Sequence, residues 1–264
     1  MNKPIIFLDS GLGCLPYAHF FRFRNGAEDI LCLADRANFP YGPKTKEELT
    51  TLLLDLTERV VQKYEPKIFV IACNTATLSA LDILQERFSS LPFVGTVPAV
   101  KPAVKASRLR SIGVLATART IAEPLIGELR DQHGRDCRLI PRAAPELVEF
   151  VEHRYSAASL QERREMARRY TDHFRAAGAD TLVLACTHFL LMRDDFIAEA
   201  GEDMAIIDSL LGVCKRIEFL LDEGRRAPAG SEGEARILVT GTGPLEPYWK
   251  HLSGAYDFTL DGNL

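Results

Sequence analysis

The chain has 264 residues, of which 47% are apolar and 26% charged, with a net charge of −4. This length suits one or two domains with a substantial core, and the composition excludes a chain that is disordered throughout. Basic residues are not in excess, so a large nucleic-acid-binding surface is not expected. The apolar runs, such as 68–73 and 182–186, are strand-sized and far below the roughly 20 residues of a membrane helix, so no membrane partner is expected.

The N-terminal segment and the cysteines indicate a cytoplasmic protein. Only four residues precede the apolar run 5–8, which is too short for a signal peptide. Six cysteines are far too few for a disulfide scaffold, and no CxxC pair occurs. Two of them, Cys73 and Cys186, each end an apolar run. The other four are expected to be buried apolar residues: Cys14, Cys32, Cys137 and Cys214.

In the first half, apolar runs predict strands over 5–8, 30–34, 68–72 and 93–97. Helices are predicted over 14–24, from Thr45 onward and over 75–89. The second of these carries apolar residues at helical spacing (49, 52, 53, 56 and 60), and Thr45 with Glu48 forms a capping box at its start.

The second half repeats this alternation. Strands are expected over 112–116, 138–141, 182–185, 205–207, 237–239 and 255–260. Helices are expected over 119–132, from Ser159 to Gly178, directly after Cys186, and over 210–223, with an exposed loop over 225–234. The order predicts parallel sheets with helices on both faces.

The two halves of the chain share the same spacing between a cysteine and the end of the next strand. Cys73 and Cys186 each follow an apolar strand and precede a predicted helix, and each lies 22 residues before the end of the next strand, at Gly95 and Asp208. The alternative is coincidence between two generic strand–helix units. The matched cysteines favour a duplicated α/β unit with a pseudo-twofold axis.

Ligands of open parallel sheets bind beyond the carboxyl ends of the strands. Four polar clusters fall there: 9–11, 35–42, 73–75 and 186–188. Asn74, Thr75 and Thr187 are residue types typical of helix N-caps, and amides at a helix start bind carboxylates and favour thiolates. Two thiols that face each other across a cleft suit removal of a proton from one face of a carbon and delivery to the other.

Other interpretations remain open at this point. Cys73, Cys186 and His188 are of the right type to bind zinc. The Gly11-x-Gly13 turn with a later Asp35 resembles part of a dinucleotide loop, although Pro16 occupies the third glycine position.

Single residues also have plain structural roles. Asp9 suits an Asx turn, His188 suits a core or capping histidine, and Glu152 suits an exposed helical position.

Five motifs, in this order, resemble the glutamate racemases of the cofactor-independent aspartate/glutamate racemase superfamily. They are 9–13 (DSGLG), 34–35 with 40–42 (AD and PYG), 72–77 (ACNTAT), 116–117 with 120–121 (AT and TI), and 185–189 (ACTHF). The resemblance covers nearly the whole chain, and the combination is specific although no single motif is.

The resemblance implies a fold of two pseudo-symmetric three-layer α/β domains with mainly parallel sheets and the active site in the interdomain cleft. The first domain is expected to be discontinuous, over 1–97 and 209–264, and the second to span 98–208. Residues 240–242 would then belong to the first domain.

The resemblance also implies racemisation of glutamate with no cofactor and no metal. Cys73 would take the α-proton of D-glutamate and Cys186 that of L-glutamate, assisted by Asp9 and His188 respectively, with Glu152 on the Cys186 side. The implied substrate-binding residues are Asp9, Ser10, Tyr41, Gly42, Asn74, Thr75, Thr187 and His188. Family members supply D-glutamate for peptidoglycan.

The chain departs from the family pattern at Cys14, Pro16, Ala185 and Leu190, and residues 208–210 lack a common glycine. These departures leave the reacting groups intact and affect loop geometry. Racemisation of aspartate or another amino acid, or amino-acid binding without turnover, remains an alternative function. The small-molecule substrate is the only partner implied by the motifs, and the sequence does not decide between a monomer and a homodimer.

Overall fold

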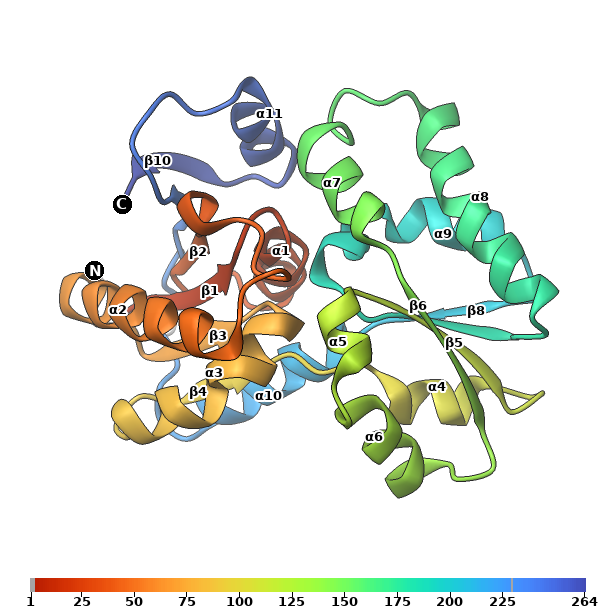
Figure 1. Cartoon of the computed structure of the whole chain (residues 1–264). Coiled ribbons are helices and arrows are strands. Elements are labelled where there is room, and N and C mark those ends of the chain that lie inside the picture. Colours follow the sequence, from red (N-terminus) through yellow and green to blue (C-terminus); the bar gives the residue numbers. More distant parts are fainter. Residues whose placement is uncertain (1–2, 229) are drawn as a thin grey trace. The chain divides into compact units, whose positions relative to one another are not determined.

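The structure is a computed structural model that describes residues 3–228 and 230–264 (Figure 1). Met1 and Asn2, which belong to the segment considered above as a signal peptide, lie outside the described residues. The chain divides into two compact units, Met1–Thr96 with Leu210–Leu264 (unit 1) and Val97–Ser209 (unit 2). Across the described ranges, no helix has both the length and the apolar character needed to cross a membrane.

Unit 1 is built around a six-stranded sheet in the order β10-β9-β2-β1-β3-β4, in which all the paired strands are parallel. Its strands are β1 (Ile5–Asp9), β2 (Ile30–Ala34), β3 (Ile68–Ile71), β4 (Phe93–Gly95), β9 (Ala235–Val239) and β10 (Thr259–Asn263). Its helices are α1 (Cys14–Arg24), the 3₁₀ helix η1 (Arg36–Asn38), α2 (Lys46–Tyr64), α3 (Asn74–Arg87), α10 (Leu210–Asp222) and α11 (Pro247–Ala255).

Both faces of this sheet are buried because side chains alternate along a strand and both sets are apolar. In β1, Ile6 and Leu8 belong to a core cluster with residues of α2 and α3. Phe7 points to the other face, where its ring lies 5.9 Å from that of Phe21 in α1. Helices α1 and α10 contact each other, as do α2 and α3, so unit 1 has three layers (Figure 1).

Unit 2 contains a four-stranded parallel sheet in the order β6-β5-β7-β8. Its strands are β5 (Ser111–Ala116), β6 (Arg138–Ala143), β7 (Thr181–Leu184) and β8 (Ala205–Ile207). Its helices are α4 (Val100–Ala106), α5 (Ala118–Ala122), α6 (Leu125–His133), α7 (Pro145–His153), α8 (Leu160–Ala176), the 3₁₀ helix η2 (Thr187–Met192) and α9 (Arg193–Ala200).

The central strand β5 shows how unit 2 is packed. Ile112 and Val114 belong to a core cluster with apolar residues of α4 and α6. Gly113 points to the opposite face, where a Cβ atom would come within 2.5 Å of the Phe174 ring of α8. A side chain larger than hydrogen would push α8 away from the sheet, so glycine is required at this position.

The predicted α/β class with parallel sheets is confirmed, as is the predicted capping box at Thr45, and a second capping box begins the helix expected from Ser159. In both boxes, the hydroxyl of the capping residue accepts a hydrogen bond from the amide of the third helical residue, a glutamate. The carboxylate of that glutamate in turn accepts from the amide of the capping residue. The two pairs are Thr45 with Glu48 and Ser159 with Glu162.

Two predicted elements were wrong. The helix expected over 119–132 is broken into α5 and α6, because Pro124 has no amide to continue the first helix. Residue 255 ends helix α11, and the last strand begins only at Thr259.

The two sheets contain the same four-strand arrangement. In unit 1 the order is β2-β1-β3-β4, and in unit 2 it is β6-β5-β7-β8, which is the same order in chain sequence. Cys73 follows the third strand of the first set after one intervening residue, and Cys186 does the same in the second. The repeat inferred from cysteine spacing is therefore a repeat of topology.

Candidate functional site

The candidate site residues of unit 1 lie beyond the carboxyl ends of three adjacent strands, β2, β1 and β3. Asp9 is the last residue of β1 and is fully buried, and Ser10 follows it. The Asp9 Oδ1 atom accepts hydrogen bonds from the amides of Gly11 (2.9 Å) and Gly13 (3.2 Å). Asp9 thus forms the Asx-type turn expected from sequence, and this turn holds its carboxylate in a defined position.

Cys73 lies at the N-terminus of α3 and is buried. The sequence had suggested Asn74 and Thr75 as capping residues, and this was wrong. The chain enters the helix one residue earlier, so Cys73 is the N-cap and makes no side-chain capping bond. Asn74 and Thr75 occupy the first turn, where both are buried. The Asn74 Oδ1 atom has no hydrogen-bond partner, which leaves a buried acceptor on the residue that follows Cys73.

Tyr41 lies in the connection between β2 and α2 of unit 1. Its hydroxyl donates to Asp35 Oδ2 at 2.7 Å, and its ring lies in the same buried cluster as Cys73. Burial, followed by the charge and hydrogen bond of Asp35 and then by Cys73 and Asp9, raises the pKa of Tyr41 well above its ordinary value. Tyr41 therefore stays protonated under ordinary conditions. Gly42, next in the chain, is half-buried.

In unit 2, Cys186 follows β7 as Cys73 follows β3, and it is equally buried. The α-helix expected directly after it is instead the 3₁₀ helix η2, and α9 begins only at Arg193. Thr187 is therefore the first residue of η2, and the suggestion that it caps a helix was wrong.

His188 and Glu152 form a buried pair in unit 2. The His188 Nε2 and Glu152 Oε2 atoms are 3.1 Å apart, and the two side chains are 4% and 2% exposed. Helix α7 carries Glu152 and packs against η2, which carries His188. The exposed helical position considered for Glu152 is thus excluded. A carboxylate bonded to one ring nitrogen fixes the orientation of an imidazole.

Apart from the dinucleotide-loop alternative for Asp35, the sequence did not assign a site role to Asp35 or Thr240. Asp35 follows β2 and is fully buried, and Thr240 follows β9, more than 200 residues later. The Thr240 hydroxyl donates to Asp35 Oδ1 at 2.5 Å. Asp35 was visible in the sequence as a polar residue at a strand end, but its partner in the C-terminal segment carried no signal.

The sequence departures fit the local structure. Pro16 is the third residue of α1, where a missing amide breaks no helical hydrogen bond. Cys14 is the first residue of α1, and its thiol lies 3.5 Å from the Gly11 carbonyl oxygen. Ala185 and Leu190 are both buried.

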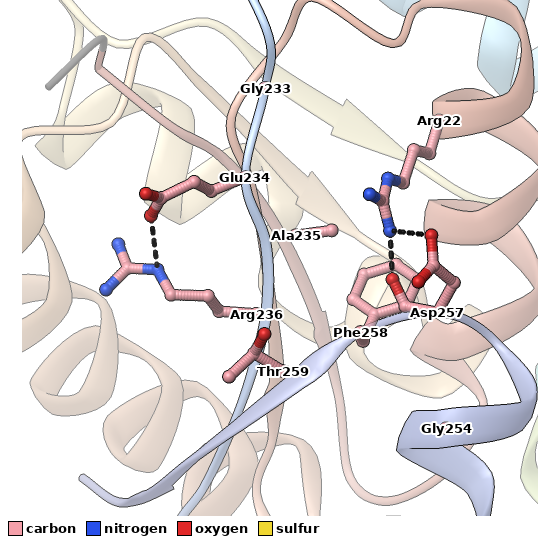
Figure 2. A pocket seen from close by; sticks show the side chains of 9 residues that line it. All are labelled: Arg22, Gly233, Glu234, Ala235, Arg236, Gly254, Asp257, Phe258 and Thr259. Atoms are coloured by element: carbon pink, nitrogen blue, oxygen red, sulfur yellow. Dashed lines mark hydrogen bonds and ion pairs between the residues drawn. The ribbon is translucent and has the colours of Figure 1, made fainter.

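A pocket of about 510 Å³ in unit 1 is lined by none of the candidate site residues, and Figure 2 shows the residues that do line it. It is lined at the starts of β9 and β10, whereas the candidate residues follow strand ends. Arg22 binds the Asp257 carboxylate, and Arg236 pairs with Glu234 and Asp261. The two arginine charges are therefore compensated by neighbouring carboxylates.

Within each unit, the described residues form no group of three or more Cys, His, Asp or Glu side chains that could hold a metal ion.

Each unit thus has a cysteine thiol after the third strand of its sheet, and a thiol is a group that can take up or deliver a proton. The family described as Asp/Glu/Hydantoin racemase matches residues 22–212. The chain belongs to this family, and it is an enzyme of the isomerase class.

Among curated proteins, the chain is similar to glutamate racemases. It is 39% identical over 237 residues to that of Treponema pallidum, covering 89% of this chain and 86% of the relative. It is 36% identical over 243 residues to that of Herpetosiphon aurantiacus, covering 91% and 93%.

The chain is also similar to solved structures of glutamate racemases. The Escherichia coli glutamate racemase in complex with L-glutamate and the activator UDP-MurNAc-Ala matches with a TM-score of 0.85 and 26% identity, over 99% of this chain and 98% of that chain. A glutamate racemase from Bacillus anthracis matches with a TM-score of 0.80 and 27% identity, over 98% and 97%.

Proposed function

We propose that this chain interconverts L- and D-glutamate by moving the α-proton between two thiols, Cys73 and Cys186, without a cofactor. The observation that carries the proposal is the equivalent position of the two thiols after the third strand of two sheets of identical order. The names of the relatives indicate glutamate as the substrate.

In the proposed reaction, one cysteine starts as a thiolate and the other as a thiol. The thiolate takes the α-proton, and the thiol delivers its own proton to the opposite face of the resulting carbanion. The two cysteines exchange protonation states in each turnover, so no proton or electron is gained overall. Cys73 takes the proton from D-glutamate, and Cys186 takes it from L-glutamate.

Three other side chains assist the thiols. Asp9, held by its turn, serves Cys73. His188 serves Cys186 and is oriented by Glu152 through the 3.1 Å contact. Because Asp9 is a carboxylate and His188 an imidazole, the two directions of reaction use different assisting groups.

The substrate is held by residues around both thiols: Asp9, Ser10, Tyr41, Gly42, Asn74, Thr75, Thr187 and His188. Asn74 suits the α-ammonium group, because its buried Oδ1 is an acceptor and an ammonium group carries three donors. The first amides of the 14-residue helix α3 suit a carboxylate, since a helix N-terminus attracts anions.

The cellular assignments form part of the same proposal. The enzyme acts in the cytoplasm and supplies D-glutamate for peptidoglycan, and a homodimer is the assembly to test first.

The test is racemisation followed by circular dichroism, with D-glutamate, L-glutamate and both aspartate enantiomers, on protein dialysed against a chelator and with no cofactor added. We expect the signal of either glutamate enantiomer to decay to zero and aspartate to react far more slowly. Faster turnover of aspartate would make the chain an aspartate racemase. Calorimetric binding of glutamate without turnover would make it an amino-acid-binding regulator, and activity restored only by zinc would support a metal site.

A further inference from the structure

Asp35 is a buried carboxylate whose hydrogen-bonding capacity is filled by the protein. Oδ1 accepts from Thr240 Oγ1 at 2.5 Å and from Asn38 Nδ2 at 3.0 Å. Oδ2 accepts from the Tyr41 hydroxyl at 2.7 Å and from the same Asn38 amide at 3.0 Å. A carboxylate has about four acceptor sites, so Asp35 has none left for a substrate. This arrangement does not suit a base and suits a positioning group.

Thr240 attaches this carboxylate to the C-terminal segment. Its hydroxyl oxygen accepts from the Ala37 amide at 3.0 Å while its proton goes to Asp35. Its own amide donates to the Ala34 carbonyl oxygen at 2.9 Å. The strand pair β2–β9 runs in register from Ile30 to Ala34, so Thr240 is placed by the sheet itself. The end of β9 therefore holds the loop that follows β2.

The bond to Asp35 determines which hydrogen bonds the Tyr41 hydroxyl can make. Its hydroxyl proton is committed to Asp35, so the phenol oxygen presents only lone pairs to its other neighbours. Tyr41 and Cys73 pack in one buried cluster, and the raised pKa of Tyr41 keeps the phenol protonated. An oxygen in this state can accept a hydrogen bond from a thiol, but it cannot donate one to a thiolate.

We infer that Asp35 and Thr240 are positioning residues that hold the Tyr41 hydroxyl as a hydrogen-bond acceptor beside the Cys73 thiol. Their function is to keep the Tyr41 proton away from the sulfur, so that Cys73 is not over-stabilised as a weakly basic thiolate. The inference concerns the same site as the proposed function and rests on the proposed role of Cys73 as a base.

The charges of Asp35, Cys73 and Asp9 all act on the Tyr41 phenol, so these groups are electrostatically coupled. The first turn of α3 contributes no acidic residue. Replacing Asp35 therefore has two separable effects: it removes a negative charge, and it releases the Tyr41 proton. A double substitution with Tyr41 distinguishes them.

The experiment measures the rate of alkylation by iodoacetamide as a function of pH, with the modified Cys73 and Cys186 peptides quantified by mass spectrometry. Alkylation reports the thiolate and needs no turnover, so its outcome is independent of whether the chain racemises glutamate. The full-length wild type, Asp35→Ala, Tyr41→Phe and the double variant are compared. Cys186 in the same sample is the internal control.

We expect Asp35→Ala to lower the midpoint pH of Cys73 alkylation by about one unit, because the released phenol donates a hydrogen bond to the thiolate. In the Tyr41→Phe background the same substitution should change the midpoint much less. Thr240→Val, which is close in shape and leaves Asp35 and Tyr41 in place, should shift it in the same direction by a smaller amount. Cys186 should respond much less than Cys73 in every variant.

The matched control is Glu28→Gln. Glu28 is also a buried carboxylate, paired with Lys67, and lies before β2 whereas Asp35 lies after it. It should leave the Cys73 midpoint unchanged.

Equal shifts from Asp35→Ala with and without the Tyr41 hydroxyl would overturn the inference, because Asp35 would then act by its charge alone. An unshifted midpoint in both Asp35→Ala and Thr240→Val would also overturn it. If Asp35→Ala does not fold, Thr240→Val with and without Tyr41→Phe decides the question.

Discussion

The two units place a cysteine at the same position and surround it differently. Cys73 precedes a 14-residue α-helix, whereas Cys186 precedes a six-residue 3₁₀ helix. The longer helix has aligned peptide dipoles that favour an anion at its start, and a short 3₁₀ turn offers much less. Two residues after the cysteine, unit 1 has Thr75 and unit 2 has His188.

Under the proposed function, one scaffold supports two ways of handling a proton. In unit 1 the helix start suits a thiolate, and the proposed assisting group is the Asp9 carboxylate at the end of the neighbouring strand β1. In unit 2 the helix contributes little, and an imidazole backed by the Glu152 carboxylate stands near the cysteine in sequence. The shared strand order fixes where the sulfur lies, and the local residues determine its chemistry.

The largest expected effect comes from removing either sulfur. Cys73→Ala and Cys186→Ala should each lower kcat/KM for glutamate by about 10⁴-fold or more in both directions, because each turnover needs one base and one acid. Circular dichroism with each enantiomer measures this. Cys32→Ala and Cys137→Ala, which remove a buried thiol from each unit away from the carboxyl ends of the strands, should retain activity. Near wild-type turnover in either site variant would exclude a two-thiol mechanism.

The next effect tests the buried His188–Glu152 pair of unit 2. His188→Asn and Glu152→Gln should each lower kcat/KM by about 10²-fold to 10³-fold, since one assists the thiol and the other orients the imidazole. The double variant should lose little more than His188→Asn alone, because Glu152 acts through His188.

The same helix provides a control for this pair. Glu149 in α7 pairs with His153 at 3.4 Å, and both of these side chains are more than half exposed. Glu149→Gln should leave kcat/KM within about twofold, since exposed pairs contribute little. Additive losses in the Glu152 and His188 double variant would show that Glu152 acts independently of the imidazole.

A subtler effect separates the two assisting groups by direction. Asp9→Asn keeps an oxygen for the Gly11 and Gly13 amides and removes the charge, so the turn should persist. The ratio of forward to reverse kcat/KM is fixed near unity for enantiomers, so Asp9→Asn and His188→Asn must each lower both equally. The two kcat values, however, start from different protonation states of the enzyme.

We therefore expect Asp9→Asn to slow kcat more from D-glutamate and His188→Asn to slow it more from L-glutamate. Isotope effects with α-deuterated substrate, measured separately from each enantiomer, should shift in opposite directions in the two variants. The same directional pattern in both would mean that these residues only shape the binding site.

The fold was predictable where local signals agree with one another. The capping box at Thr45 requires only residues three apart and occurs as predicted, and the helix expected from Ser159 begins there. The break at Pro124 was missed because an apolar helical pattern continues across it, and the proline alone decides the outcome.

The site was predictable only in part, for a different reason. Strand ends identify Cys73, Cys186 and Asp9 as candidates, because any parallel sheet gathers its polar ends at one edge. The role of Asp35 depends on Thr240, and the two meet only because β9 pairs with β2 after a separation of 205 residues. No local pattern encodes such a contact.

The smallest expected effect on activity concerns Asp180, which precedes β7 while Cys186 follows it. Its carboxylate accepts from the Ser107 hydroxyl (2.6 Å) and from the amides of Arg108 (2.6 Å) and Leu109 (2.7 Å). Burial alone would raise the pKa of Asp180, but these hydrogen bonds outweigh burial and leave the pKa below its ordinary value.

Asp180→Asn should therefore lower the free energy of unfolding by about 2–3 kcal/mol near neutral pH, with kcat/KM unchanged at 25 °C. A carboxylate with a lowered folded-state pKa contributes its full stabilisation above about pH 4, and this contribution is lost as the pH falls through the folded-state value. The difference in Tm between wild type and variant, followed by calorimetry, should be largest at pH 6–7 and shrink below pH 4. Asp131→Asn, at a side chain that is 53% exposed, is the control with little expected change. A loss of activity in folded Asp180→Asn would mean that the two ends of β7 are coupled, which contradicts a division in which one end stabilises the fold and the other performs the chemistry.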